Sequence, residues 1–145
     1  MKKSLSLIVL AFLLTSCASS TQYVKSLDSS QYNTQMAKIY VLRPSAFGSA
    51  ITMKIYQDDK LIGKLGPTSY LSWEVDPSKG PINVISKSEN KDMVTIIPQE
   101  GKTYYLKQKI HMGIVIARTE LELIGVEEAN QILEKLKKPQ VNYIE

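Results

Sequence analysis

The chain has 145 residues, of which 43% are hydrophobic and 22% charged, and its formal net charge is +4. This size fits one domain with flanking segments, and the apolar fraction excludes a wholly disordered or collagen-like chain. The single cysteine excludes an internal disulfide framework and any zinc site built on paired cysteines.

Residues 1–16 have the layout of a secretion signal. Two lysines precede an apolar run from Leu5 to Leu14, and small residues stand directly before Cys17. The run is about half of the ~20 residues that a membrane-spanning helix needs. Removal of residues 1–16 would lower the net charge from +4 to +2, so the charge gives no reason to expect a nucleic-acid partner.

The four residues 14–17, LTSC, resemble a bacterial lipobox. This resemblance implies cleavage before Cys17, attachment of a diacylglyceryl group to its sulfur and acylation of its new amino group by a fatty acid such as palmitate. A plain secretory signal and a buried free cysteine are the alternatives. Ala18 and Ser19 stand where an Asp would retain a Gram-negative lipoprotein in the inner membrane. By resemblance, we therefore expect the periplasmic face of the outer membrane, with the outer surface as an alternative.

Residues 17–36 are polar and rich in serine, and we interpret them as the lipidated N-terminus and a flexible tether. From residue 37 the apolar side chains alternate with polar ones, as in half-buried strands. Turn-forming residues separate these runs at regular spacing, which is typical of a β-sandwich or barrel. We predict a mainly β domain over residues 37–125, an Ig-like or prealbumin-like sandwich of seven or eight strands. The expected strands are Ala37–Arg43, Ile51–Gln57, Leu61–Leu65, Tyr70–Val75, Ile82–Lys87, Met93–Ile97, Thr103–His111 and Ile114–Leu123.

Residues 126–138 change to helical spacing. Val126, Ala129 and Leu133 share one face, so an amphipathic helix should pack on the domain. Pro139 ends the helix, and residues 139–145 form a tail.

Several short motifs follow one another across residues 37–125: AKIYVLRPS at 37–45, DDK at 58–60, Ser69-Tyr70, VDP at 75–77, GKTYYL at 101–106 and LEL at 121–123. Together they resemble a family of small bacterial lipoproteins that carry one uncharacterised domain. The turn at 58–60 lacks the usual glycine, and the loop at 76–81 has fewer prolines and glycines than is typical. The resemblance implies a lipid-anchored envelope β-domain and brings no catalytic residues.

Catalytic chemistry finds little support in the sequence. His111 is the only histidine and is expected on an edge strand, near a turn at the strand end, so a metal site would need acids from elsewhere. Glu120 and Glu122 share a strand face about 7 Å apart, which makes a hydrolase a remote alternative, although Arg118 on that face favours a solvated surface. Asp58 and Asp59 fit turn geometry better than calcium binding. We expect no enzyme activity, metal or cofactor.

A binding surface is the better hypothesis. Tyr40, Tyr56 and Tyr105 are expected opposite the aliphatic faces of their strands, together with Lys54 and Lys107. If these strands share a sheet, they form a tyrosine–lysine face suited to an envelope protein or a cell-wall glycan such as peptidoglycan. Alternatively, the tyrosines only shield the wet face of a sheet. Trp73 is expected in the core.

Overall fold

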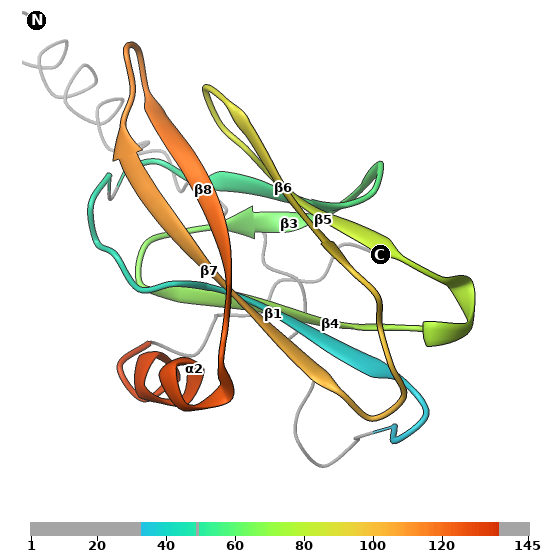
Figure 1. Ribbon diagram of the computed structural model, residues 1–145. Coiled ribbons are helices and arrows are strands. Elements are labelled where there is room, and N and C mark those ends of the chain that lie inside the picture. Colours follow the sequence, from blue (N-terminus) through green and yellow to red (C-terminus); the bar gives the residue numbers. More distant parts are fainter. Residues whose placement is uncertain (1–32, 49, 137–145) are drawn as a thin grey trace, which may run out of the picture.

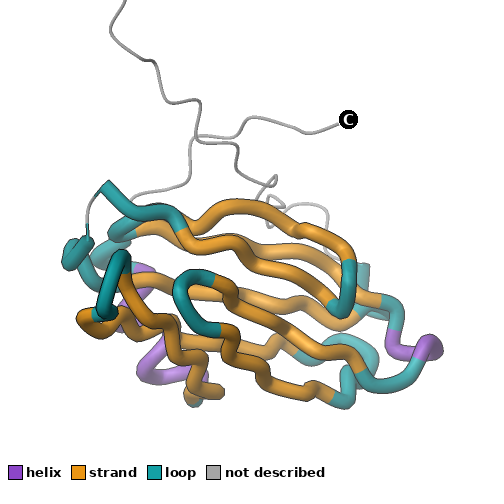
Figure 2. The backbone as a smooth tube through the Cα atoms, turned by 90° about the horizontal axis from the view of Figure 1, so that it is seen from above, coloured by secondary structure: helices purple, strands orange, loops and turns teal. Residues whose placement is uncertain are grey.

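Two four-stranded sheets pack face to face in this protein (Figures 1 and 2). The structure, a computed structural model, describes residues 33–48 and 50–136. Helix α2 (Val126–Leu133) follows the last strand, and the short 3-10 helix η3 (Pro77–Lys79) joins two strands. The strands are β1 (Ala37–Arg43), β2 (Met53–Gln57), β3 (Lys60–Leu65), β4 (Ser69–Val75), β5 (Ile82–Lys87), β6 (Lys91–Ile96), β7 (Thr103–Met112) and β8 (Ala117–Ile124).

The predicted eight-strand sandwich is confirmed. The first sheet has the order β4-β1-β7-β8 and the second sheet the order β3-β2-β5-β6. Strand β1 pairs antiparallel with β4 and parallel with β7. In an Ig-like domain the first strand shares its sheet with the second, fifth and fourth strands, so the observed order corresponds to the prealbumin-like alternative.

Alternating apolar residues from both sheets form the core, as the period-two pattern predicts. Trp73 is a core residue, and its indole N–H donates a hydrogen bond to the side chain of Gln57 at 2.9 Å. The hydrophobic residues that are fully buried in this cluster are Ala37, Ile39, Val41, Ile55, Leu65, Leu71, Val84 and Leu106.

Strand β1 is buried on both faces, which the alternation alone did not predict. Leu42 and Lys38 alternate with the core residues and share the outer face with Tyr40, yet Leu42 is completely buried and Lys38 almost so. The reason is the position of β1 inside its sheet, with α2 in contact with β1 and β7 (Figure 1). The Lys38 ammonium lies 5.3 Å from the centroid of the Tyr40 ring.

All odd-numbered strands run toward one end of the sandwich, which we call the tip end, and the opposite end is the base end. The β5–β6 and β7–β8 hairpins project side by side at the tip end (Figure 1). Strand β1 begins at the base end, so the chain enters the domain there.

Buried Arg43 ties the two sheets together at the tip end. Its guanidinium donates to the carbonyl oxygens of Ile51 and Leu65, at 2.7 and 3.1 Å, and to those of Phe47 and Gly48, at 3.0 and 3.1 Å. Burial lowers the pKa of Arg43 from its ordinary value. Arg43, a residue of the first sheet, therefore fixes the β1–β2 loop and the end of β3.

Side chains of the β5–β6 turn and of β6 close the sandwich along the free edge of β8. Asn90 accepts a hydrogen bond from the N–H of Thr119 and donates one to its carbonyl oxygen, and Asp92 accepts one from the N–H of Leu121. Ser88 donates to the carbonyl oxygen of Ala117. These contacts satisfy backbone groups that an exposed edge would offer to another chain.

The hairpin turn at 58–60 forms without glycine because Asp58 adopts a φ of 52°, a left-handed conformation that Asp tolerates. Its carboxylate accepts hydrogen bonds from the backbone and side-chain N–H groups of Asn83, at 2.9 and 3.1 Å. Asp58 therefore has the structural role in the turn that the sequence favoured over calcium binding.

Several predicted bounds are wrong. The second strand begins at Met53 rather than Ile51. The last strand begins at Ala117 rather than Ile114, because residues 113–116 form the β7–β8 turn, and Val115 is exposed there. Leu123, near the end of β8, is exposed whereas Leu121 is buried.

The predicted C-terminal helix is too long. Helix α2 ends at Leu133, and the N–H groups of Lys135 and Leu136 then bond the carbonyl oxygens three residues back, which tightens the chain into turns. The predictions for the signal, Cys17, most of the tether and the tail at 139–145 lie outside the described residues.

Candidate functional site

Three tyrosines gather on the outer face of the first sheet. The parallel register places Tyr40 of β1 opposite Tyr105 of β7, and the rings stack with centroids 5.2 Å apart. Tyr70 of β4 lies on the other side of Tyr40, with ring centroids 5.9 Å apart. All three side chains are half-buried. We call this group the tyrosine cluster, and it offers a row of aromatic faces three strands wide.

The five-residue face expected from the sequence does not form as one surface. Tyr40, Tyr105 and Lys107 lie on the first sheet, whereas Tyr56 and Lys54 lie on the second. Alternation places a side chain inward or outward, but strand pairing decides which sheet carries it. Tyr70, which the sequence analysis missed, joins the cluster because β4 pairs with β1.

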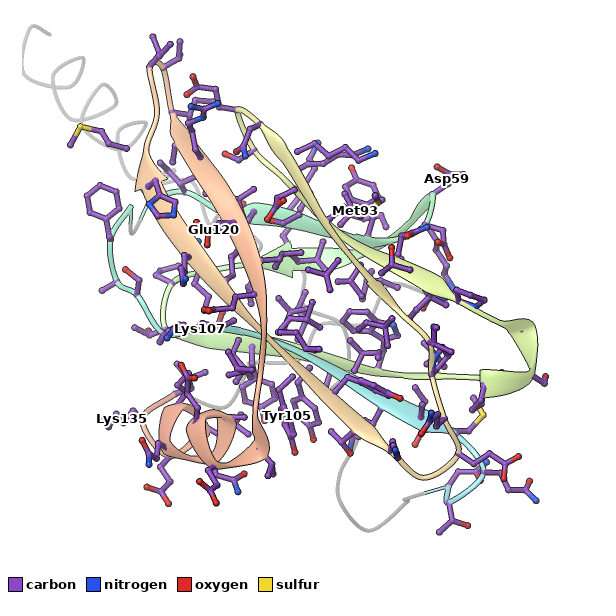
Figure 3. The ribbon with its side chains drawn as sticks, in the orientation of Figure 1. Asp59, Met93, Tyr105, Lys107, Glu120 and Lys135 are labelled. Atoms are coloured by element: carbon purple, nitrogen blue, oxygen red, sulfur yellow. The ribbon has the colours of Figure 1, made fainter. Side chains whose placement is uncertain are left out.

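Helix α2 borders the tyrosine cluster. The Lys107 ammonium forms a salt bridge with Glu128 of this helix at 2.7 Å, and Figure 3 shows Tyr105 and Lys107 beside α2. Ala129 faces inward from the helix and is completely buried. Lys107 therefore binds the helix to the sheet and is already paired with an acid.

The charged residues of β7 and β8 neutralise one another. Lys109 contacts Glu120 at 3.3 Å and Glu122 at 3.0 Å, and Glu120 contacts His111 at 2.9 Å. The hydrogen bond from Lys109, followed by that from His111, lowers the pKa of Glu120 from its ordinary value. A general acid needs a raised pKa, so this arrangement fits a solvated ion-pair network better than a hydrolase site. His111 lies on an inner strand of the sheet, not on an edge as expected.

A shallow hollow of about 450 Å³ opens beside this network. Residues of β6, β7 and β8 line it, among them Asp92, His111, Arg118 and Glu120. Within the described residues no group of three His, Cys, Asp or Glu side chains could hold a metal ion. In the same part of the chain no helix combines the length and apolar character needed to cross a bilayer.

A second surface, on the second sheet, escaped the sequence analysis. Lys64, Lys54, Lys87 and Lys91 lie directly opposite one another across β3, β2, β5 and β6. We call these residues the lysine row. Tyr56 belongs to this surface, because the Lys87 ammonium lies 4.5 Å from the centroid of its ring. The row depends on the register of three strand pairs, so no local spacing in the sequence reveals it.

The sequence analysis also missed the exposed β7–β8 turn. Met112, Ile114 and Val115 are 81%, 94% and 82% exposed, and Ile116 is more than half exposed. The consecutive apolar residues 114–116 break the period-two pattern, and this break was the available sign that they do not belong to the strand.

The comparisons with known proteins support the part of the resemblance that concerns a single uncharacterised domain. The chain is 28% identical over 138 residues to an uncharacterized protein of Haemophilus influenzae, an alignment that covers 90% of this chain and 80% of the relative. No solved structure is significantly similar to it. Residues 33–120 match the family described as "Protein of unknown function (DUF2846)". The match covers more than half of the chain and all but the end of the sandwich, and the protein therefore belongs to this family.

Proposed function

We propose that this protein is a lipid-anchored, non-catalytic binding module of a bacterial cell envelope. The observation that carries the anchor is the order of features in residues 1–17: a basic start, a short apolar run, small residues and the single cysteine. Two or more acyl chains on Cys17 hold a protein stably at a membrane. With Ala18 and Ser19 after the cysteine, the proposed location is the periplasmic face of the outer membrane.

The sandwich then serves as a rigid scaffold for a binding surface, and the tyrosine cluster is the candidate for a protein partner in the envelope. Stacked Tyr40 and Tyr105 have little rotational freedom left, so contact through them orders few side chains. Neighbouring charges are balanced by salt bridges to Glu128, Glu120 and Glu122. A surface of this kind suits a partner recognised by shape and aromatic contact more than by charge.

A cell-wall glycan is the alternative partner, because sugar rings stack on tyrosine faces. Sedimentation with purified peptidoglycan separates the two ideas. The glycan hypothesis predicts that the protein sediments and that the Tyr40→Ala/Tyr105→Ala double variant does not. If the unaltered protein stays in solution, the glycan alternative is excluded, and crosslinking through the tyrosine cluster in solubilised membranes then tests for a protein partner.

Hydrolysis through Glu120 or Glu122 remains the remote alternative. Both carboxylates are bound to Lys109, which fits a surface ion-pair network. If a Glu120→Gln/Glu122→Gln variant keeps the full cellular phenotype, this alternative is removed.

Mass spectrometry of the mature chain tests the anchor directly. The proposal predicts an N-terminal peptide that begins at Cys17 and carries the mass of a diacylglyceryl group and a further acyl chain. A Cys17→Ser variant should remain unprocessed and unmodified. A free Cys17 thiol in the unaltered protein, or a retained leader, would exclude the anchor.

A further inference from the structure

The β7–β8 turn presents an apolar surface at the tip end. Met112, Ile114, Val115 and Ile116 follow one another there with most of their side chains in solvent. Scattered exposed apolar residues are ordinary, but a contiguous group at the end of a projecting hairpin indicates a surface that is covered in use. Phe47, in the β1–β2 loop of the same end, is half exposed as well.

The turn is held in a defined shape by Glu89 from the β5–β6 hairpin. Its carboxylate accepts hydrogen bonds from the backbone N–H groups of Ile114, Val115 and Ile116, at 3.0, 3.1 and 3.2 Å. Gly113 is required, because a Cβ atom there would collide with this carboxylate and lie 3.0 Å from the backbone of Ala117. These three N–H groups are therefore paired with a carboxylate of the protein and do not depend on water for their hydrogen bonds.

The lysine row lies at the same end. Lys87 and Lys91 flank the β5–β6 turn that carries Glu89, and Lys54 and Lys64 continue the row across β2 and β3. Like charges directly opposite each other on a sheet destabilise it, and none of the four forms a salt bridge with an acid within the described residues. Two acids at this end, Glu89 and Asp92, accept backbone N–H groups instead.

We propose that the tip end contacts the surface of a bilayer that contains anionic phospholipid. The apolar turn would enter the boundary between head groups and acyl chains, and the lysine row would lie at the level of the phosphates. A protein pocket would explain the turn alone, whereas a cationic row that crosses a whole sheet fits an extended anionic surface. This inference rests on the proposed function for the presence of a membrane nearby.

The lengths of the parts are compatible with an anchor and a tip on one bilayer. The chain between Cys17 and the turn that precedes β1, residues 18–32, spans at most about 50 Å. Strand β7, which ends at the β7–β8 turn, has 10 residues and is about 33 Å long. The chain enters the domain at the base end. The tether therefore has to extend along the length of one strand for the tip end to reach the membrane, and its reach is sufficient.

Tryptophan quenching tests the contact. The full processed chain is reconstituted in vesicles of phosphatidylcholine, with or without phosphatidylglycerol, in which the acyl chains carry bromine as a quencher. One variant carries Val115→Trp at the tip end, and the matched control carries Ile97→Trp, because Ile97 is also exposed but follows β6 at the base end. Buried Trp73 contributes the same background to both.

We expect strong quenching at position 115 and little at position 97, with a clear increase at position 115 when phosphatidylglycerol is present. A Lys54→Gln/Lys87→Gln/Lys91→Gln variant should abolish that increase, since each lysine near an anionic surface contributes about a fivefold change in binding. The control Lys60→Gln/Lys79→Gln/Lys102→Gln, at the base end, should keep the increase. Equal quenching at both positions, or quenching at 115 that ignores the anionic lipid, would overturn the proposal.

The anchor and the tip contact fail separately in this design. If mass spectrometry finds Cys17 unmodified, the same variants are added to preformed vesicles, and sedimentation with anionic but not neutral vesicles still supports the tip contact. If Cys17 is acylated and position 115 remains unquenched, the anchor stands and the tip contact is excluded.

Discussion

The charged residues on the two outer faces of the sandwich are arranged in opposite ways. On the first sheet, lysines form salt bridges with acids: Lys107 with Glu128, and Lys109 with Glu120 and Glu122. On the second sheet four lysines line up across all four strands without an acid opposite any of them. The first arrangement stabilises the fold and the second opposes it. The lysine row is therefore better explained by an external anion than by a contribution to folding.

The largest change in stability should come from substitution of Arg43, which links the first sheet to the second. Arg43→Met removes the donors for four carbonyl oxygens, of which that of Leu65 is buried. We expect a loss of about 3 kcal/mol or more in the free energy of unfolding, because buried acceptors without partners are costly. Denaturant unfolding measures it. Arg43→Lys, which keeps the charge but fewer donors, should lie between the two proteins, and an Arg43→Met protein of unchanged stability would contradict this role.

A smaller, local change should follow from Glu89→Gln at the tip end. An amide accepts hydrogen bonds through one oxygen only, so it cannot replace the carboxylate that accepts three N–H groups. Hydrogen exchange at Ile114, Val115 and Ile116 should become faster, while exchange in the core strands stays the same. Unchanged protection at these three positions would show that Glu89 does not hold the turn.

Acid should weaken the charge pairing on the first face. The pKa of Glu120 is lowered by Lys109 and His111, so its contribution to stability is complete above the ordinary pKa of 4.5 and is lost as the pH falls through the lower value of the folded state. The decline in unfolding free energy below about pH 4.5 should therefore be smaller in a Glu120→Gln variant. An identical decline in both proteins would exclude a contribution from this network.

The sequence predicted what depends on local pattern and missed what depends on pairing. Period-two alternation located all eight strands and placed Trp73 in the core, and the motifs indicated the family. The meeting of Tyr40 with Tyr105 and Tyr70, and the separation of Tyr56 and Lys54 from them, depend on which strands are neighbours.

Two further features were hidden because they join distant residues. Arg43 donates to carbonyl groups and Glu89 accepts from N–H groups that lie up to 27 positions away in the sequence. No local motif around either residue predicts such a role. The lysine row requires three registers to be known at once. The sequence shows the chemistry of each side chain, but it does not show which other side chains become its neighbours in the fold.

The contrast between the faces is tested most directly by one pair of matched substitutions. Lys54 stands opposite both Lys64 and Lys87, whereas Lys109 contacts Glu120 and Glu122. In urea unfolding at low salt, Lys54→Gln should raise the free energy of unfolding by a few tenths of a kcal/mol up to about 1 kcal/mol. Lys109→Gln should lower it, and added salt should shrink both changes. If Lys54→Gln instead destabilises the protein as Lys109→Gln does, the lysine row contributes to folding and the account of the second face is wrong.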